Sequence, residues 1–291
     1  MDAFAKINLF LAVIGKREDG YHELVSVMQK IGLRDRLTIA KAQHNTSGTL
    51  VTLKTDAPNL PTNDTNLVVK AANLLIKEYG IATPLAINLT KRIPTGAGLG
   101  GGSSDCAATL LGINQLLGLQ VPLDKLMELG ATLGADVPFC VMANSCNTTA
   151  LAQGIGEKLT PLPPHPKCHV VLACPKIHVS TGEIFKVLTL CGLTGINIQA
   201  KLDNFMAAYN SKDILQISKN FYNTFTPITS KIHPQISSLI SDLQNHGAYN
   251  AAMTGTGSTV FAYFENENKA KMVCEILEKT HTNTKFCHTE I

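Results

Sequence analysis

The feature that most constrains the fold is a glycine-rich stretch in the first half of the chain. Five of the seven residues from Gly96 to Gly102 are glycine, and two serines and an aspartate follow them. Glycines let backbone N–H groups approach an anion, and a helix N-terminus adds free donors and the positive end of its dipole. We expect the helix to start at Ser103 or Ser104, with Asp105 as a solvent-facing capping carboxylate. The stretch predicts a phosphate-binding loop in preference to a flexible surface loop.

Common nucleotide-binding and nucleophile motifs do not fit this stretch. No lysine follows the loop, which excludes a Walker P-loop, and the Gly-x-Ser-x-Gly elbow of hydrolases does not occur. Gly96-x-Gly98-x-x-Gly101 matches the dinucleotide fingerprint, which also requires a strand ending in an acidic residue about twenty residues on. Pro122 stands where that central strand would lie, so a dinucleotide oxidoreductase is the least favoured alternative.

Composition places the chain among globular proteins. With 291 residues, 45% of them hydrophobic and 16% charged, intrinsic disorder is excluded. The net charge of +3 is small and scattered, so we expect no nucleic-acid partner. No apolar run reaches spanning length and no signal peptide is recognisable, so we expect a cytoplasmic protein without a membrane partner. The eight cysteines include no C-x-x-C pair, which argues against a zinc ribbon and for a reducing compartment.

Apolar periodicity predicts the order of the secondary structure. Residues 4–14 alternate as a strand does, which places Lys6 and Asn8 side by side on one face. The helix after the glycines would bury Cys106 in its apolar stripe. Further strands are expected at 35–42, 49–55, 84–90, 169–175, 251–254, 258–264 and 285–291, and helices at 66–79, 122–133, 181–190, 198–209, 234–245 and 266–280. The second half thus predicts a split βαβ arrangement.

Four segments together resemble a known family. Pro94–Ala108 is similar to the second motif of the GHMP kinase superfamily, which includes galactokinase, homoserine kinase and mevalonate kinase, and Ala252–Phe261 is similar to its third motif. Ala5–Phe10 together with Asp19-Gly-Tyr-His-Glu-Leu24 resembles the first motif of the branch that serves the non-mevalonate isoprenoid pathway. Gly134-Ala-Asp-Val-Pro138 adds a fourth match, and the segments follow one another in the expected order.

The resemblance implies an α+β, two-domain GHMP kinase fold. Its N-terminal, ATP-binding domain would be ribosomal-protein-S5-domain-2-like, and its C-terminal domain a ferredoxin-like split βαβ unit. The polar, proline-rich residues 144–166 suggest a boundary that divides the chain into domains 1–160 and 161–291. The implied activity is ATP-dependent phosphorylation of the 2-hydroxyl of a small-molecule substrate, cytidine diphosphate methylerythritol, with ATP and Mg²⁺ as cofactors.

The resemblance also implies roles for individual residues. Asp136 would be the general base, with Lys6 orienting it, and Asn8 would hold the polar groups of the substrate. Tyr21 and His22 would recognise cytidine, with Phe185 and Thr181 alongside. Lys91 and Asn66 would lie near adenine, and Ser103 or Ser104 would add a hydroxyl ligand to Mg²⁺. The phosphate cradle would consist of Pro94, Thr95, Gly96, Ala97, Gly98, Leu99, Gly100, Gly101, Gly102, Ser103 and Ser104.

Two departures and two alternatives accompany this interpretation. Residues 143–150 look longer and more polar than the family's pattern, and Cys106 stands where a small alanine is common. A mevalonate-type or homoserine-type kinase is the alternative within the superfamily, but its acceptor carries no base to stack on Tyr21 and His22. A nucleotide-binding regulator on the same scaffold would keep the glycine loop and would need neither Lys6 nor Asp136.

Overall fold

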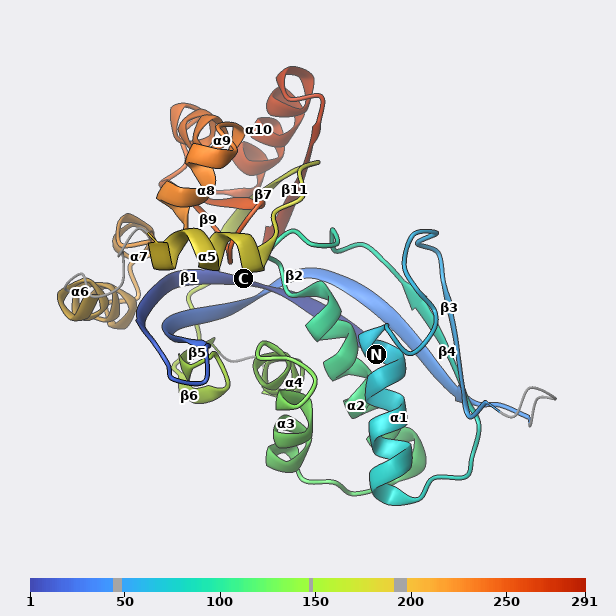
Figure 1. Ribbon diagram of the computed structural model, residues 1–291. Coiled ribbons are helices and arrows are strands. Elements are labelled where there is room, and N and C mark those ends of the chain that lie inside the picture. Colours follow the sequence, from blue (N-terminus) through green and yellow to red (C-terminus); the bar gives the residue numbers. More distant parts are fainter. Residues whose placement is uncertain (44–48, 147–148, 191–197) are drawn as a thin grey trace. The chain divides into compact units, whose positions relative to one another are not determined.

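The structure is a computed structural model that describes residues 1–43, 49–146, 149–190 and 198–291 (Figure 1). It divides into two compact units. Unit 1 consists of Met1–Ala5, Leu33–Thr95 and Gly100–Asn147, and unit 2 of Lys6–Gly32, Gly96–Leu99 and Thr148–Ile291. Strands β1 (Asp2–Lys16) and β2 (His22–Lys41) are long enough to contribute residues to both units. The domain boundary expected at residue 160 stays a prediction.

Unit 1 combines a small sheet with four described helices, α1 (Leu67–Tyr79), α2 (Gly101–Leu117), α3 (Leu123–Ala131) and α4 (Val137–Cys146). Strand β3 (Val51–Thr55) runs parallel to β4 (Leu85–Thr90), which pairs antiparallel with the end of β2. Helix α1 starts where the Asn66 side chain accepts a hydrogen bond from Val68 N, and it ends at Gly80 in the left-handed conformation. The helices pack against one another, α2 against both α1 and α4.

One part of unit 2 continues β1 and β2 into a second set of strands. The hairpin of β5 (Thr149–Gly154) and β6 (Lys158–Leu162) pairs antiparallel with β2, and the short β8 (Tyr222–Asn223) pairs parallel with β1. Within this unit the strand order is therefore β6-β5-β2-β1-β8. Strand β8 pairs with β1 only at Phe10 and Leu11. At Lys6 and Asn8 the main chain of β1 instead donates to Leu99 O and to the hydroxyl oxygen of Thr254.

The other part of unit 2 is an antiparallel sheet in the order β11-β7-β10-β9. Its strands are β7 (His169–Pro175), β9 (Asn250–Met253), β10 (Val260–Phe264) and β11 (Thr284–Glu290). The described helices of this unit are α5 (Thr181–Leu190), α6 (Ile198–Asn210), α7 (Ile214–Lys219), α8 (Thr226–Ile232), α9 (Gln235–Asn245) and α10 (Glu267–Thr280). When the four strands are numbered along the chain, their spatial order in the sheet is 4-1-3-2, and α10 connects β10 to β11. This topology confirms the ferredoxin-like split βαβ prediction.

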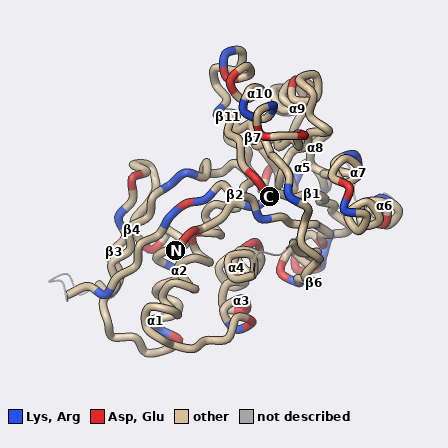
Figure 2. The backbone as a smooth tube through the Cα atoms, turned by 180° about the vertical axis from the view of Figure 1, so that it is seen from behind, with Lys and Arg blue, Asp and Glu red and all other residues tan. Residues whose placement is uncertain are grey.

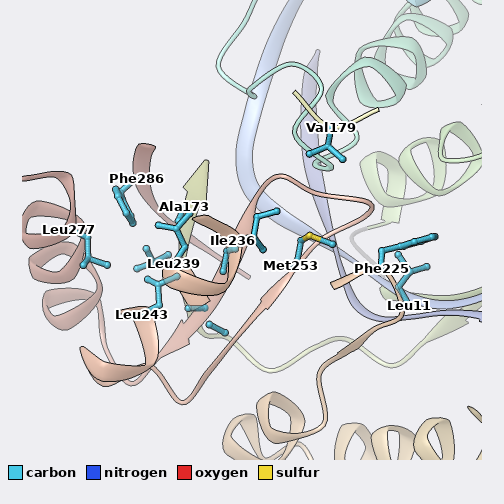
Figure 3. Close-up of a cluster of buried hydrophobic side chains, with 14 of the residues drawn as sticks. Leu11, Ala173, Val179, Phe225, Ile236, Leu239, Leu243, Met253, Leu277 and Phe286 are labelled. Atoms are coloured by element: carbon cyan, nitrogen blue, oxygen red, sulfur yellow. The ribbon is translucent and has the colours of Figure 1, made fainter. Parts of the chain in front are cut away.

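A cluster of buried apolar side chains holds this sheet to its helices (Figure 3). Ala173 of β7 lies beside Leu239 of α9, Met253 of β9 lies between Ile236 and Phe225, and Leu277 of α10 lies at one end of the cluster. Leu11 and Val13 of β1 belong to the same cluster, so the first strand of the chain helps to cover the C-terminal sheet. Burying apolar side chains of this size contributes about 1.5–3 kcal/mol each.

Most expected elements are confirmed within a few residues, but one strand has other bounds, and α4, α7, α8, β5, β6 and β8 were not predicted. The strand expected at 35–42 begins at His22, and residues 149–162, within the segment 144–166 for which no element was expected, form β5 and β6. Helix α4 was missed because the residues from Val137 to Ala143 are all buried and show no amphipathic period. Of the unusual stretch 143–150, residues 147 and 148 lie outside the described residues. Across the described ranges no helix has the length and apolarity to span a membrane, and charges of both signs are interspersed (Figure 2).

Candidate active site

Residues 96–99 of the glycine loop belong to unit 2, where they are fixed by strand β1 and by the segment between β9 and β10. Lys6 N donates to Leu99 O over 3.0 Å, and Thr259 N donates to Ala97 O over 3.2 Å. Gly98 has a φ of +78°. A Cβ there would collide with Thr254 O and lie 3.0 Å from Gly257 O, so position 98 requires glycine both for its conformation and for its contacts.

The second glycine-rich segment, Thr254–Ser258, packs directly on this loop. The hydroxyl oxygen of Thr254 lies 3.3 Å from Gly98 O, and a Cβ on Gly255 would lie 3.2 Å from Gly98 Cα. The segment that resembles the third motif therefore supports the loop. The contact also explains the second glycine cluster, because two backbones can approach this closely only where side chains are absent.

Lys6 and Asn8 share one face of β1, as their alternation predicted, and both are buried. The Lys6 ammonium donates to Asn8 Oδ1 over 2.9 Å and to Gly98 O over 3.2 Å. Asn8 Nδ2 donates to the hydroxyl of Ser26 over 2.9 Å. The polar atoms of Asn8 are therefore engaged within unit 2, and its geometry is that of a residue that positions Lys6 and the loop. Its contact with substrate stays a prediction.

Helix α2 of unit 1 supplies the second part of the predicted phosphate site. It begins at Gly101, with Gly100 as an N-cap in the left-handed conformation (φ +69°) and no side-chain cap. The predicted start at Ser103 or Ser104 is therefore wrong by two or three residues, because Ser104 N already donates to Gly100 O within the first turn. Free amides at an uncapped helix start are a donor set suited to phosphate oxygens.

The two serines of this turn differ in their surroundings. Ser104 is fully buried, and its hydroxyl donates to Phe4 O over 2.7 Å, which directs it into unit 1. Ser103 remains half-buried. A hydroxyl that already donates to a backbone carbonyl is poorly placed to serve a cation, so Ser103 is the better candidate for a magnesium ligand.

Asp105, in the first turns of α2, is buried rather than solvent-facing, so the expectation for it is wrong. Its Oδ2 accepts a 2.7 Å ion pair from Lys91, whose ammonium also contacts Asp35. Burial, together with the nearby Asp35, raises the pKa of Asp105 to about 7. Burial acts to lower the pKa of Lys91, but the two carboxylates outweigh it and raise that pKa.

Asp136 lies in unit 1, immediately before α4. Its carbonyl oxygen accepts a hydrogen bond from Cys140 N over 3.1 Å, and its side chain is half-buried. The buried residues Val137 and Pro138 follow and fix the start of the helix. Because Lys6 belongs to unit 2, the predicted pairing of Lys6 with Asp136 stays a prediction.

The residues expected to recognise cytidine come together only in part. In unit 2 the His22 and Phe185 rings lie 4.8 Å apart at 37°, and Phe185 in turn meets the edge of Phe225. Burial, with the nearby charge of Lys16, lowers the pKa of His22 and favours the neutral ring. Tyr21 is 60% exposed, as a ring that receives a ligand could be.

Thr181 and Asn66 have contacts of their own in the structure. The hydroxyl of Thr181, the first residue of α5, lies 3.1 Å from the hydroxyl of Thr256 and so links that helix to the second glycine segment. Asn66 caps α1 and donates to Pro61 O over 2.7 Å. Sequence reasoning missed Asp35, Ser26 and Thr254, which contact predicted residues from distant parts of the chain. No local pattern marks Asp35 or Ser26, whereas Thr254 lies within the segment that resembles the third motif.

Comparisons with known proteins agree with this arrangement of motifs. The family model for the GHMP kinases N terminal domain matches residues 66–144, and that for the GHMP kinases C terminal domain matches residues 205–283. The 4-diphosphocytidyl-2-C-methyl-D-erythritol kinase of Lachnoclostridium phytofermentans is 44% identical over 93% of this chain and 89% of its own length. The chain belongs to the family of these kinases. A relative of the same name from Lachnospira eligens is 40% identical over 94% of this chain and 91% of its own length.

Solved structures extend the same conclusion. A crystal structure of 4-(cytidine 5'-diphospho)-2C-methyl-D-erythritol kinase matches with a TM-score of 0.81 at 29% identity, covering 100% of this chain and 98% of that one. The mevalonate kinase of L. major matches with a TM-score of 0.75 at 14% identity over 100% of this chain and 94% of its own, which shows the shared fold alone. The chain therefore has the α+β GHMP kinase fold and is an ATP-dependent small-molecule kinase.

Proposed function

We propose that this kinase transfers the γ-phosphoryl group of ATP to the 2-hydroxyl of 4-diphosphocytidyl-2-C-methyl-D-erythritol, a step of the non-mevalonate pathway to isopentenyl diphosphate. The observation that carries the proposal is the identity of 44% with a kinase of that name over 93% of this chain. The aromatic pair of His22 and Phe185, beside the exposed Tyr21, supports a substrate that carries a base.

The proposed donor site uses the backbone of the glycine-rich segment. The amides at the start of α2 and the loop Gly96–Gly100 would surround the phosphates of ATP, with Asn66 toward the adenine and Lys91 beside the entry of the loop. The glycines at these positions leave room for phosphate oxygens next to the main chain. Mg²⁺ would be held through Ser103 and would neutralise charge on the β- and γ-phosphates during transfer.

The proposed chemistry needs one proton acceptor and one fixed cation from the protein. Asp136 takes the proton of the 2-hydroxyl, the oxygen then bonds to the γ-phosphorus, and the bond from that phosphorus to the β–γ bridging oxygen breaks to release ADP. Lys6, held by Asn8 and Gly98, stabilises the negative charge that develops on the attacking oxygen. Tyr21, His22, Phe185 and Thr181 would hold the cytidine end of the acceptor. We also propose that the enzyme acts in the cytoplasm and that the sequence boundary between its two kinase domains lies near residue 160.

An assay of ADP release tests this function. The enzyme receives ATP and Mg²⁺ with 4-diphosphocytidyl-2-C-methyl-D-erythritol, with mevalonate or with homoserine. We expect turnover with the cytidine-containing acceptor only, and a product phosphorylated at the 2-hydroxyl by NMR. Equal or faster turnover with mevalonate or homoserine would refute the proposed acceptor but leave the kinase assignment intact.

A further inference from the structure

The buried ion pair between Lys91 and Asp105 spans the glycine-rich segment. Lys91 stands just before that segment, after β4, and Asp105 stands just after it, in α2. Nζ of Lys91 is 2.7 Å from Oδ2 of Asp105, and the side chains are only 10% and 4% exposed. The ion pair therefore joins the two ends of a chain segment, and the glycine-rich loop lies between those ends.

Asp35 of β2 fixes the chain where it enters this segment. Its Oδ1 accepts hydrogen bonds from the amides of Arg92 and, over 2.8 Å, of Ile93, while its Oδ2 contacts the Lys91 ammonium. Asp35 is fully buried. Three consecutive residues before the loop are thus bound to one carboxylate, through two main-chain amides and one side chain.

The first turn of α2 rests directly on the same residues. A Cβ added to Gly101 would lie 3.0 Å from Cγ2 of Ile93 and 3.4 Å from Nζ of Lys91. The backbone of Gly101 thus lies close to the side chains of Ile93 and Lys91, and a displacement of the Lys91 side chain would act on the backbone at the start of α2. Those are the amides assigned above to the phosphates.

The charges of this cluster are not balanced. One ammonium faces two buried carboxylates, and among the described residues Oδ1 of Asp105 has no hydrogen-bond partner. Apolar side chains of similar volume generally stabilise a fold as well as a buried ion pair does. The ion pair instead fixes the position of the Lys91 side chain, because an ammonium between two carboxylates has a defined place that a methyl group would not have.

We propose that Lys91, Asp35 and Asp105 are positioning residues that set the distance between the entry of the glycine loop and the start of α2, and thereby the affinity for ATP. The inference rests on the proposed function, because it takes α2 to be the phosphate-binding helix. It assigns the ammonium of Lys91 to the two carboxylates and not to the nucleotide.

A double-mutant cycle on ATP binding tests the proposal. Titration calorimetry with ATP and Mg²⁺, in the absence of acceptor, compares the wild type, Lys91→Met, Asp105→Leu and the double variant. We expect each single variant to weaken ATP binding by about tenfold, since small misplacements of binding groups are costly. The double variant should bind no more weakly than the weaker single one, because both remove the same connection. The Michaelis constant for the acceptor should stay within about twofold in all variants that turn over.

The neighbouring Arg92 provides a matched control. Its guanidinium makes an exposed 3.0 Å ion pair with Asp56 in the same segment of chain. Arg92→Gln should therefore leave ATP binding within about twofold of the wild type, as exposed pairs contribute little. A loss as large as that of Lys91→Met would overturn the proposal, because any disturbance of the segment would then suffice.

Two conservative variants separate positioning from simple loss of folding. Asp105→Asn keeps an acceptor for Lys91 and removes one of the two like charges, so it should retain ATP binding and raise the melting temperature at pH 8. Lys91→Arg should remain folded but weaken ATP binding, because the planar guanidinium cannot take the place of the ammonium between two carboxylates. Wild-type affinity in Lys91→Arg, or additive losses in the cycle, would overturn the proposal. Absence of ATP binding by the wild type would instead refute the proposed function.

Discussion

The side-chain oxygen of Asn8 accepts a hydrogen bond of 3.1 Å from the backbone amide of Gly255, near the other end of the chain. The same oxygen accepts hydrogen bonds from the Lys6 ammonium at 2.9 Å and from the Thr254 hydroxyl at 3.1 Å. One amide side chain thus joins the lysine of the first strand to the turn that packs on the glycine loop. Asn8 is therefore as important for placing Lys6 as the strand that carries both.

Replacing Asn8 by alanine should lower both stability and turnover. The variant removes the buried acceptor of the Gly255 amide and one of the acceptors of the Lys6 ammonium, which costs about 2–4 kcal/mol of unfolding free energy. We expect kcat to fall by at least about tenfold, since Lys6 loses its fixed place. Urea unfolding and steady-state kinetics measure the two effects. Ser26→Ala, which removes a partner of Asn8 that does not contact Lys6, should cost about 1 kcal/mol with a smaller change in kcat.

Asp136→Asn should remove the proposed general base with little effect on the fold. We expect kcat to fall by about two to four orders of magnitude, while ATP still binds with nearly unchanged affinity. Lys6→Met should also lose turnover. Rapid-quench kinetics and calorimetry measure these values. Wild-type turnover in Asp136→Asn would mean that another group accepts the proton.

Alanine at Tyr21 or His22 should affect the two substrates differently. Loss of either ring removes stacking surface or hydrogen bonds for the base, so the Michaelis constant for the cytidine substrate should rise by about tenfold or more. The Michaelis constant for ATP should change little. Tyr249→Ala, which removes another exposed ring, is the control. Equal losses for both substrates would indicate that Tyr21 and His22 support the fold instead.

Cys106 should react slowly with thiol reagents in spite of its place in a helix whose start would bind phosphate. Its side chain is fully buried in unit 1, and burial raises the pKa of the thiol to about 12, so the reactive thiolate is scarce. Mass spectrometry of maleimide-treated protein should find the exposed Cys146 modified first. ATP should slow modification of Cys106 further, and the adduct should abolish activity. Fast, ATP-independent labelling would contradict the placement of α2.

His165 should make the fold sensitive to mild acid. Its ring contacts Tyr209 and Tyr263, Nδ1 donates to Pro166 O over 2.6 Å, and burial lowers its pKa to about 4. The folded protein keeps this ring neutral, while the unfolded chain takes up a proton near pH 6.5. Its contribution is therefore complete above pH 6.5 and is lost as pH falls toward 4, by up to about 3 kcal/mol. Guanidinium unfolding at pH 7.5 and 4.5 should show a smaller pH dependence in His165→Phe.

Local sequence patterns predicted most helices and strands of this fold, whereas long-range contacts determined the surroundings of individual side chains. The alternation around Lys6 and Asn8 and the capping of α1 depend on neighbours in sequence, and both were predictable. The position of Asp105 was not, because a carboxylate next to two serines has the same pattern whether it caps a helix or is buried against Lys91. Lys91 is itself bound by Asp35, from a strand 70 residues before Asp105 in the sequence.

The start of α2 shows a second limit. Serine is a better N-cap than glycine by intrinsic preference, so the sequence favoured Ser103 or Ser104. In the structure Gly100 takes the cap position because its backbone can adopt a φ of +69°, and the serines become part of the first turns. Conformational freedom at one glycine thus overrides side-chain capping at the residues that follow.

Because Leu11 and Val13 belong to the apolar cluster of the C-terminal sheet, a C-terminal fragment expressed without the first strand would lack part of that cluster (Figure 3). A fragment that begins at residue 161 would carry every strand of that sheet, yet Phe225 and the other side chains around Leu11 would meet water. Such a fragment should be recovered as an aggregate. A synthetic peptide of the first strand should bind its exposed apolar surface and so reduce the aggregation. Complementation in trans, rather than expression of isolated halves, is the suitable format for studying the two ends of this chain separately.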